Sequence, residues 1–434
     1  MPQFLNSLAP DFEAQFTALL SAKRETSAEV GDAVDVILAD IRQNGDEALT
    51  ALTKKYDGMA LTPAQMAITS DEISAEIAKV LPHEHEALKL AADRIRAYHE
   101  KQRPEDLWWQ DDTGAELGWR WTAVETAGLY VPGGLASYPS SVLMNAIAAQ
   151  VAGVDRLIMC CPTPSGVINP LVLAAADLSG VDQVFRVGGA QAIAAMAYGT
   201  SMIPKVDVIT GPGNAYVAAA KARVYGAVGI DMIAGPSEIL VIADRHNDPD
   251  WIALDLLSQA EHDESAQSIL ITDSADFGIA VGDAVEARLK TLDRKDIAGP
   301  SWRDNGAIIT VRDLDEAVTL SDRLAPEHLE ICTHDAEVIS RKIRHAGAIF
   351  IGAYTPEAIG DYVGGPNHVL PTARSARFAS GLSVLDFMKR TTLAKMSPAA
   401  LASIGPAAET LAKSESLQAH GLSVRARLNR LNEG

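Results

Sequence analysis

Cysteine is scarce in this sequence, with three among 434 residues. Two of the three, Cys160 and Cys161, are neighbours, and adjacent cysteines do not easily bridge each other. The scarcity excludes a small secreted fold held together by disulfides. We therefore expect free thiols and a reducing compartment.

Basic residues and long apolar runs are also lacking. Lys and Arg number 37 against 57 Asp and Glu, a formal net charge of −20. Nucleic acid and anionic membrane surfaces would repel such a chain, so we expect a small-molecule partner. No run approaches the ~20 apolar residues of a membrane span. The first residues reach Asp11 and Glu13 before any apolar core of signal length, so a cytoplasmic location is expected.

The sequence has no repeat of solenoid period, no low-complexity tract and no G-x-G-x-x-G dinucleotide fingerprint. These absences exclude a repeat protein and a low-complexity chain, so we expect a globular protein. A length of 434 residues with 47% apolar residues is enough for more than one core, with a prior of about three domains.

Short apolar runs alternate with Ala-rich helical stretches from about Trp108 onward, a rhythm typical of parallel sheets covered by helices. The first set has strand-like runs at 129–131, 156–159, 184–187 and 206–209, with helical stretches at 141–151, 170–178, 190–198 and 215–224. The second set has strand-like runs at 239–242, 268–271, 308–311 and 348–351. Two α/β sheets in tandem are predicted. The tail from about Leu382 has a helical pattern and no strand signal.

Four glycine-rich loops accompany these strands, at 131–134, 187–191, 210–214 and 234–238. In open α/β sheets, ligands bind in loops at the carboxyl ends of the strands. Glycine lets a ligand approach the backbone, and a following helix offers free N–H groups to a phosphate. Without the fingerprint, both interpretations remain open: tight turns or cofactor loops.

A polar constellation is more informative than the glycines. Gln259 and His262 lie one turn apart on a predicted helix, so an amide oxygen and an imidazole share a face, as half of a metal site would. Glu327 and His328 follow a proline, and the Gly- and Pro-rich stretch 360–368 carries further acid and imidazole groups. Such residues in loops are typical carriers of general acid/base catalysis and metal ligation.

Other histidines have simpler interpretations. His83, His85 and His99 lie on a charged helical stretch and are predicted to be solvated surface residues. In the tail, Glu415 and His420 are five positions apart, about 140° around an ideal helix. They can face one site only if the helix ends between them.

Four motifs together resemble one family, histidinol dehydrogenase. They are Gln-Ala-Glu-His-Asp at 259–263, Pro-Glu-His-Leu at 326–329, Gly-Gly-Pro-Asn-His-Val-Leu-Pro at 364–371 and Tyr-Val-Pro-Gly-Gly at 130–134. The resemblance spans roughly residues 10 to 430. It implies oxidation of L-histidinol through L-histidinaldehyde to L-histidine, the last steps of histidine biosynthesis, with NAD and one zinc ion per subunit.

The same resemblance implies roles for particular residues. The zinc ligands would be Gln259, His262, Asp361 and His420. His328 would be the general base and Glu327 would activate water. Substrate contacts are expected from Ser237, Gln259, His262, His328, Asp361, His368, Glu415 and His420, and NAD contacts from Tyr130, Gln191 and Asn214.

The resemblance also implies a homodimer in which the C-terminal tail of one subunit completes the partner's active site. The implied fold is α/β, with two Rossmann-like parallel-sheet domains, one inserted in the other. The expected parts are an N-terminal helical arm (1–25), a first α/β domain (26–129 and 237–381), an inserted α/β domain (130–236) and a helical tail (382–434).

Two alternatives remain. One is a related zinc- and NAD-dependent dehydrogenase of another amino alcohol or polyol, for which Arg374 and Arg377 could bind an anionic substrate group. The other is a non-catalytic, metal-stabilised binding protein. Glu327 beside His328 argues against the second, because a structural zinc site closes its coordination and needs no acid/base pair.

Overall fold

The structure, a computed structural model, describes residues 2–21, 28–133, 138–233 and 235–432. The chain forms two units. The larger unit is Met1–Gln102 with Glu125–Phe387, and the smaller is Arg103–Val124 with Met388–Gly434. The larger unit contains two parallel sheets, which confirms the predicted α/β class. Among the described residues, no helix combines the length and apolarity that a membrane crossing requires.

The first sheet has six parallel strands in the order β1-β11-β10-β9-β12-β13. The strands are β1 (Gln3–Asn6), β9 (Glu238–Ala243), β10 (Gln267–Thr272), β11 (Ala307–Thr310), β12 (His328–Cys332) and β13 (Ala348–Ile351). Its N-terminal strand was not predicted, because residues 1–25 were expected to be a helical arm. β1 extends the sheet by pairing with β11, so Gln3–Asn6 are part of this sheet.

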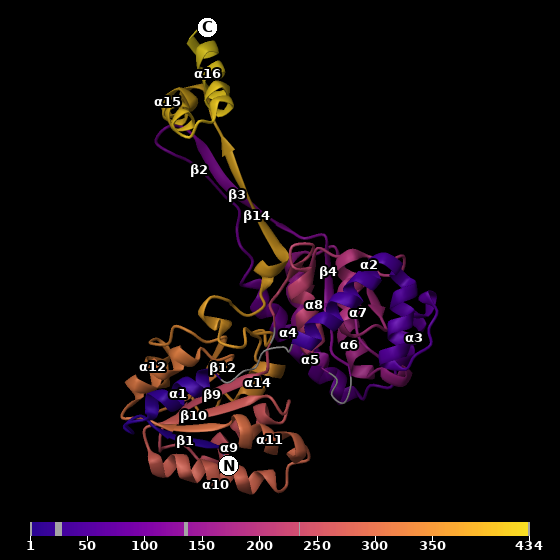
Figure 1. Cartoon of the computed structure of the whole chain (residues 1–434), viewed down its shortest axis with the longest axis vertical. Helices are drawn as coiled ribbons and strands as arrows, with labels where there is room; N and C mark the ends of the chain where they lie inside the picture. The colour runs from indigo at the N-terminus through magenta and orange to yellow at the C-terminus, as the bar shows by residue number, and fades with distance from the viewer. Residues whose placement is uncertain (1, 22–27, 134–137, 234, 433–434) are drawn as a thin grey trace. The chain divides into compact units, whose positions relative to one another are not determined.

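Helices cover both faces of the first sheet because its strand residues alternate between two cores. Leu240 and Ile242 face a core shared with α1 and α12, whereas Ile239 and Val241 face one shared with α9, α10 and α11 (Figure 1). The helices are α1 (Phe12–Ser21), α9 (Pro249–Ala260), α10 (Ala275–Leu289), α11 (Lys295–Asn305) and α12 (Leu314–Leu324). Two shorter helices follow, α13 (Ala336–Ser340) and α14 (Glu357–Tyr362).

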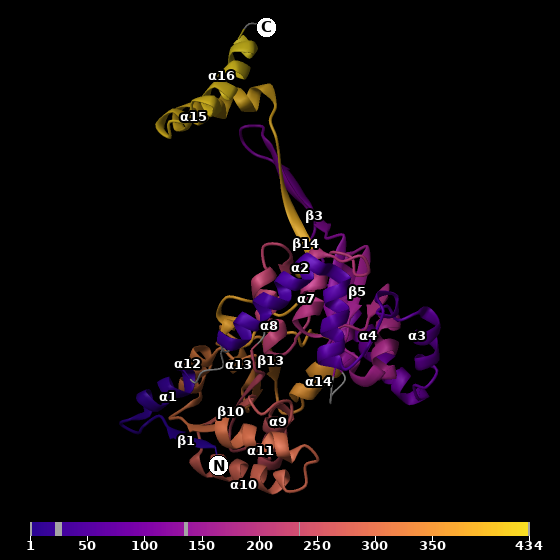
Figure 2. The ribbon, with the colours of Figure 1, turned by 45° about the vertical axis from the view of Figure 1, so that its right-hand side comes forward.

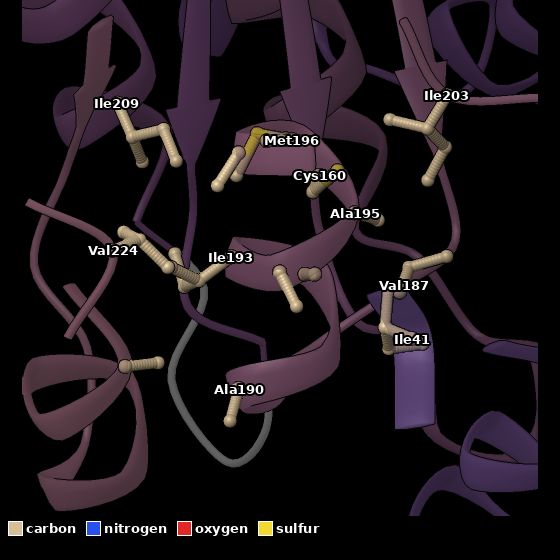
Figure 3. Close-up of a cluster of buried hydrophobic side chains, with 14 of the residues drawn as sticks. Ile41, Cys160, Val187, Ala190, Ile193, Ala195, Met196, Ile203, Ile209 and Val224 are labelled. Atoms are coloured by element: carbon tan, nitrogen blue, oxygen red, sulfur yellow. The ribbon is translucent and has the colours of Figure 1, made fainter. Parts of the chain in front are cut away.

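The second sheet has five parallel strands in the order β6-β5-β4-β7-β8. The strands are β4 (Thr126–Tyr130), β5 (Arg156–Cys160), β6 (Gln183–Phe185), β7 (Val208–Thr210) and β8 (Gly229–Ile230). The helices between them are α5 (Pro139–Ala152), α6 (Pro170–Leu178), α7 (Gly189–Tyr198) and α8 (Ala215–Val224). Small alanines let α7 pack closely into the core drawn in Figure 3, where Ile193 and Met196 lie among buried neighbours.

Three helices between residues 28 and 100 pack on the second sheet, although the domain plan implied by the resemblance grouped residues 26–129 with the first. They are α2 (Ala28–Asp57), α3 (Ser70–Ile77) and α4 (Pro82–Glu100). α2 contacts α7 and α8 (Figure 2), and α4 contacts α5 and α6. Because Val34, Ile37 and Ile41 of α2 are buried in the core of the second sheet, that grouping was wrong for these helices. Periodicity identifies an apolar face but not its partner.

The smaller unit contains an antiparallel sheet in the order β14-β3-β2 and two helices. The elements are β2 (Leu107–Gln110), β3 (Glu116–Ala123), β14 (Met388–Lys395), α15 (Pro398–Ser414) and α16 (Gln418–Asn432). The predicted absence of strand from the tail was therefore wrong. Most residues of β14 and all of β2 are exposed, so these strands lack the apolar alternation by which a half-buried strand is recognised.

A candidate active site in the larger unit

One cavity of about 780 Å³ is bordered by loops from both parallel sheets. From the second sheet come Pro132, after β4, and the loop 211–214, after β7. From the first sheet come residues at the beginnings of strands, including Ser237 before β9 and His328 at the start of β12. The carboxyl edge of one sheet and the amino edge of the other thus share a cavity. The ligand-binding loops of both sheets were expected at the carboxyl ends of their strands. That prediction was wrong for the first sheet, whose amino edge borders the cavity.

The two ring nitrogens of His328 have different surroundings. Nδ1 lies 3.0 Å from the carbonyl oxygen of Glu238 and 3.1 Å from Glu357 Oε1. A carbonyl oxygen can only accept, so Nδ1 carries the hydrogen. Nε2 is buried without a hydrogen-bond partner among the described residues. Burial lowers the pKa of His328 to about 4, so the ring is neutral at pH 7 and Nε2 can accept a proton.

Glu327 lies beside His328 in the lining of the cavity. Its Oε2 accepts the backbone N–H of Glu238 at 2.9 Å and lies 3.8 Å from His328 Nδ1. The backbone of Glu238 therefore orients both side chains, because its N–H holds the carboxylate and its C=O holds the imidazole. Both residues were expected in a loop, but His328 is the first residue of β12.

Three of the four predicted metal ligands line the same cavity, namely Gln259, His262 and Asp361. Gln259 Oε1, near the end of α9, is buried without a hydrogen-bond partner in the described part of the chain. Such an oxygen costs about 1–3 kcal/mol unless something else binds it. A cation is a suitable partner for this oxygen, and the imidazole of His262 and the carboxylate of Asp361 are donor types that zinc takes. The residues present fit a zinc ion.

His368 also lines the cavity and is held at both nitrogens. Nδ1 lies 2.9 Å from the carbonyl oxygen of Asp361, and Nε2 lies 3.2 Å from Ser141 Oγ. Burial lowers its pKa. The ring is thereby fixed next to the carboxylate of Asp361, whose Oδ1 is 3.8 Å from His368 Nδ1.

The prediction of a solvated His99 was wrong. Its side chain is completely buried in α4, where Nδ1 lies 2.8 Å from the carbonyl oxygen of Ile95. Nε2 lies 3.2 Å from the amide nitrogen of Asn367, next to His368. His99 lies on the apolar stripe of α4. The prediction failed because the residues next to His99 in the sequence are charged or polar.

The three residues expected to contact NAD have different positions. Asn214 lines the cavity, where its Oδ1 caps α8 by accepting the N–H groups of Tyr216 and Val217. Tyr130 and Gln191 are buried, and the hydroxyl of Tyr130 accepts the N–H of Gly189 at 3.0 Å. Tyr130 and Gln191 are absent from the lining described for the cavity. Two residues of the predicted glycine loops, Gly134 and Ala234, lie outside the described residues.

Glu357 is one of the cavity residues that sequence reasoning missed. It is buried at the start of α14 and lies 3.1 Å from His328 Nδ1. His328, Glu357 and Asp361 bring donor atoms within 4.8 Å of one another. An acidic residue after a proline at a helix start is also a common surface feature, so its sequence gave no sign of burial.

Glu415 and His420 belong to the smaller unit. Glu415 caps the end of α15, His420 lies in the first turn of α16, and both are exposed. The helix does end between them, with Ser416 at a positive φ of 60°. The cavity lining comes entirely from the larger unit.

Comparison with known proteins assigns the family. The family model described as histidinol dehydrogenase matches residues 20–428. Histidinol dehydrogenases of Ruegeria pomeroyi and Cereibacter sphaeroides are each 69% identical to this chain, with 100% of both chains covered. A crystal structure of histidinol dehydrogenase from Elizabethkingia anophelis has a TM-score of 0.95 and 37% identity, covering 99% of each chain. The chain belongs to the histidinol dehydrogenase family.

Proposed function

We propose that this chain oxidises L-histidinol through L-histidinaldehyde to L-histidine, using NAD⁺ as the hydride acceptor and one zinc ion per subunit. Family membership supports this reaction. The observation that carries the proposal is the buried, neutral His328, whose Nε2 has no partner among the described residues, in a cavity shared with Glu327, Gln259 and Asp361.

His328 acts as the base of the alcohol oxidation. The substrate hydroxyl gives its proton to Nε2 while a hydride leaves the carbon for NAD⁺, so the alcohol becomes an aldehyde and the two electrons leave with the hydride. The carbonyl oxygen of Glu238 holds Nδ1 and keeps Nε2 in the accepting form. Glu357 Oε1 also lies 3.1 Å from Nδ1, and burial together with the neighbouring carboxylates raises the pKa of this acid well above its usual range.

Glu327 serves the second oxidation. Its carboxylate takes a proton from water as the oxygen adds to the aldehyde carbon, which gives the hydrate. A second hydride then leaves the same carbon for another NAD⁺, and the carboxylate product forms with loss of protons. Glu327 is oriented for this role by the N–H of Glu238, which Oε2 accepts at 2.9 Å.

Gln259, His262, Asp361 and His420 would hold the zinc ion. The metal would supply positive charge that anchors and orients the substrate's amine and imidazole. The alternative trio of His328, Glu357 and Asp361 is less suitable, because it would consume the base needed for proton transfer. Ser237, His368 and Glu415 would complete the contacts to the substrate.

A homodimer would supply His420 and Glu415 to the partner's cavity. The smaller unit supports this proposal, because it exposes large apolar side chains that water solvates poorly, with Trp108 47% and Leu411 63% exposed. Exposed apolar groups of this kind are typical of surfaces that bind a partner. Tyr130, Gln191 and Asn214 would contact NAD⁺ at the edge of the second sheet.

The test is NADH production from L-histidinol by the purified chain. Two NADH per substrate are expected, with loss of activity on treatment with a chelator and recovery on addition of zinc. One NADH per substrate would refute the four-electron reaction. Activity that survives complete removal of metal would refute the role of zinc.

A further inference from the structure

An ion pair lies behind the loop 211–214 at the edge of the cavity. Lys221 of α8 and Asp231, just after β8, are joined through Nζ and Oδ1, and their side chains are only 2% and 1% exposed. Lysine is almost never buried so completely unless it is paired. Both residues belong to the lining of the cavity.

The pair holds both backbone polar groups of Gly211. Lys221 Nζ donates to the carbonyl oxygen of Gly211 at 2.9 Å, and Asp231 Oδ2 accepts the N–H of Gly211 at 2.8 Å. Asp231 Oδ1 also accepts the N–H of Met232 at 2.6 Å. The two side chains thus fix one residue of the loop in position and orientation.

The loop needs such support because of its own composition. Gly211 has a φ of +112°, and a Cβ there would lie 2.0 Å from the carbonyl oxygen of Tyr130. Pro212 has no N–H to contribute. Gly213 is pressed against Val217, and Asn214 uses its side-chain oxygen to cap α8. Hydrogen bonds from outside the loop therefore determine where its backbone lies.

Stability alone is a weak reason for a buried ion pair. Removing two charges from water is costly, and apolar replacements of similar volume are often neutral or stabilising. The specific result of Lys221 and Asp231 is the placement of Gly211, between the second sheet and the cavity.

We propose that the Lys221–Asp231 pair is a positioning device for the cofactor: by holding Gly211 it fixes the loop 211–214 in the form that binds the dinucleotide. The inference rests on the proposed function, which assigns NAD⁺ to this edge of the cavity. The two residues are positioning residues, because they act through the loop backbone and through Asn214.

The test uses the full chain with Lys221→Met and Asp231→Asn combined, which removes both charges and preserves volume. NAD⁺ binding, measured by calorimetry, is expected to weaken by about tenfold. L-histidinol binding should stay within about twofold and Tm within a few degrees. In steady state, KM for NAD⁺ should rise while KM for L-histidinol stays constant.

The matched control is Arg223→Met with Asp35→Asn. It removes the partly exposed ion pair between Arg223 of the same helix, α8, and Asp35 of α2, and should leave NAD⁺ affinity unchanged. Asp231→Asn alone keeps an amide oxygen that can accept from Gly211 but leaves the buried charge of Lys221 without its carboxylate, so its Tm should fall further than that of the double variant.

Two results would overturn the inference. One is wild-type NAD⁺ affinity in a folded double variant, and the other is equal weakening for NAD⁺ and L-histidinol. If the wild-type chain itself binds no NAD⁺ while L-histidinol binds, the proposed cofactor fails as well. Wild-type binding of NAD⁺ therefore separates failure of the inference from failure of the proposed function.

Discussion

His328 and Glu327 are neighbours in the sequence whose surroundings give them different chemistry. His328 presents a nitrogen that can take a proton, and Glu327 presents a carboxylate fixed by a backbone N–H. General bases contribute about 10²–10⁴-fold to rate. His328→Asn should therefore slow NADH formation from L-histidinol by about that factor, whereas Glu327→Gln should chiefly slow oxidation of L-histidinaldehyde.

Each half-reaction is measured by supplying L-histidinol or L-histidinaldehyde and recording the first turnover. His83→Asn, an exposed histidine of α4, is the control and should behave as wild type. If both variants slow both half-reactions equally, the division of roles between the two residues is incorrect.

The half-buried Asp255 and the buried Glu330 form a carboxyl pair. Burial raises the pKa of Asp255 to about 6, and burial together with the charge of Asp255 raises that of Glu330. Glu330 Oε1 also accepts the N–H of Glu357 at 2.5 Å, so this pair supports the start of α14.

The raised pKa values make stability depend on pH with a definite sign. A folded state that favours the protonated acid is stabilised below the ordinary pKa of about 4, and this contribution is lost as pH rises through about 6. Asp255→Asn stays neutral at every pH. Its unfolding free energy relative to wild type should increase by about 1–2 kcal/mol between pH 5 and pH 8.

Urea unfolding at several pH values measures this difference. Asp283→Asn, at an exposed position of α10, should show no such trend. A difference between Asp255→Asn and wild type that is constant with pH would contradict the assignment of a raised pKa to this carboxyl pair.

At the scale of elements, α4 supports the loop that carries His368. Arg94 donates to the carbonyl oxygens of Val363 and Gly364, and His99 accepts from Asn367. Burial lowers the pKa of His99, which keeps it neutral and able to accept. His99→Leu should cost about 1–3 kcal/mol of unfolding free energy, because the amide of Asn367 loses a partner in a buried place.

A double-mutant cycle with Asn367→Ala tests this contact. The combined loss should be smaller than the sum of the single losses by about 0.5–3 kcal/mol, since both changes remove the same interaction. His85→Leu, an exposed change on the same helix, should have little effect. Additive losses would mean that the two side chains act independently.

Elements with an uninterrupted apolar pattern were predictable from the sequence. β9 is buried throughout and reads as a continuous apolar run. β12 was missed because His328 and Glu330 interrupt its apolar residues, and their burial depends on partners in β9, α9 and α14. Such partners are distant in sequence, so local patterns do not reveal them.

The candidate site was also predictable only in part: its residues could be identified from the sequence, but their position in the fold could not. The residue types of Gln259, His262, Glu327 and His328 indicated their chemistry, and the structure places all four in one cavity. Which edge of the first sheet they occupy depends on how the two sheets pack together. Periodicity within one segment carries no information about that packing.

At the scale of the whole molecule, the cavity of the larger unit holds Gln259, His262 and Asp361, and the fourth expected zinc ligand is in the smaller unit. If a partner subunit supplies His420, then each active site contains residues from two chains. Symmetry requires that a dimer with two swapped tails contains two such sites.

Subunit mixing distinguishes shared sites from self-contained ones. Neither His420→Ala nor His328→Asn should be active alone. In a mixed dimer with shared sites, one site carries both changes and the other carries neither. With random pairing, half of the dimers are mixed, so activity should recover to about a quarter of wild type. Co-expression with two affinity tags and an NADH assay measures the recovery.

The control pair, Gln259→Ala with His328→Asn, should recover no activity. Both changes lie in the larger unit, so each site of a mixed dimer retains one of them. An isolated mixed dimer of the first pair without activity would contradict the sharing of His420 between subunits.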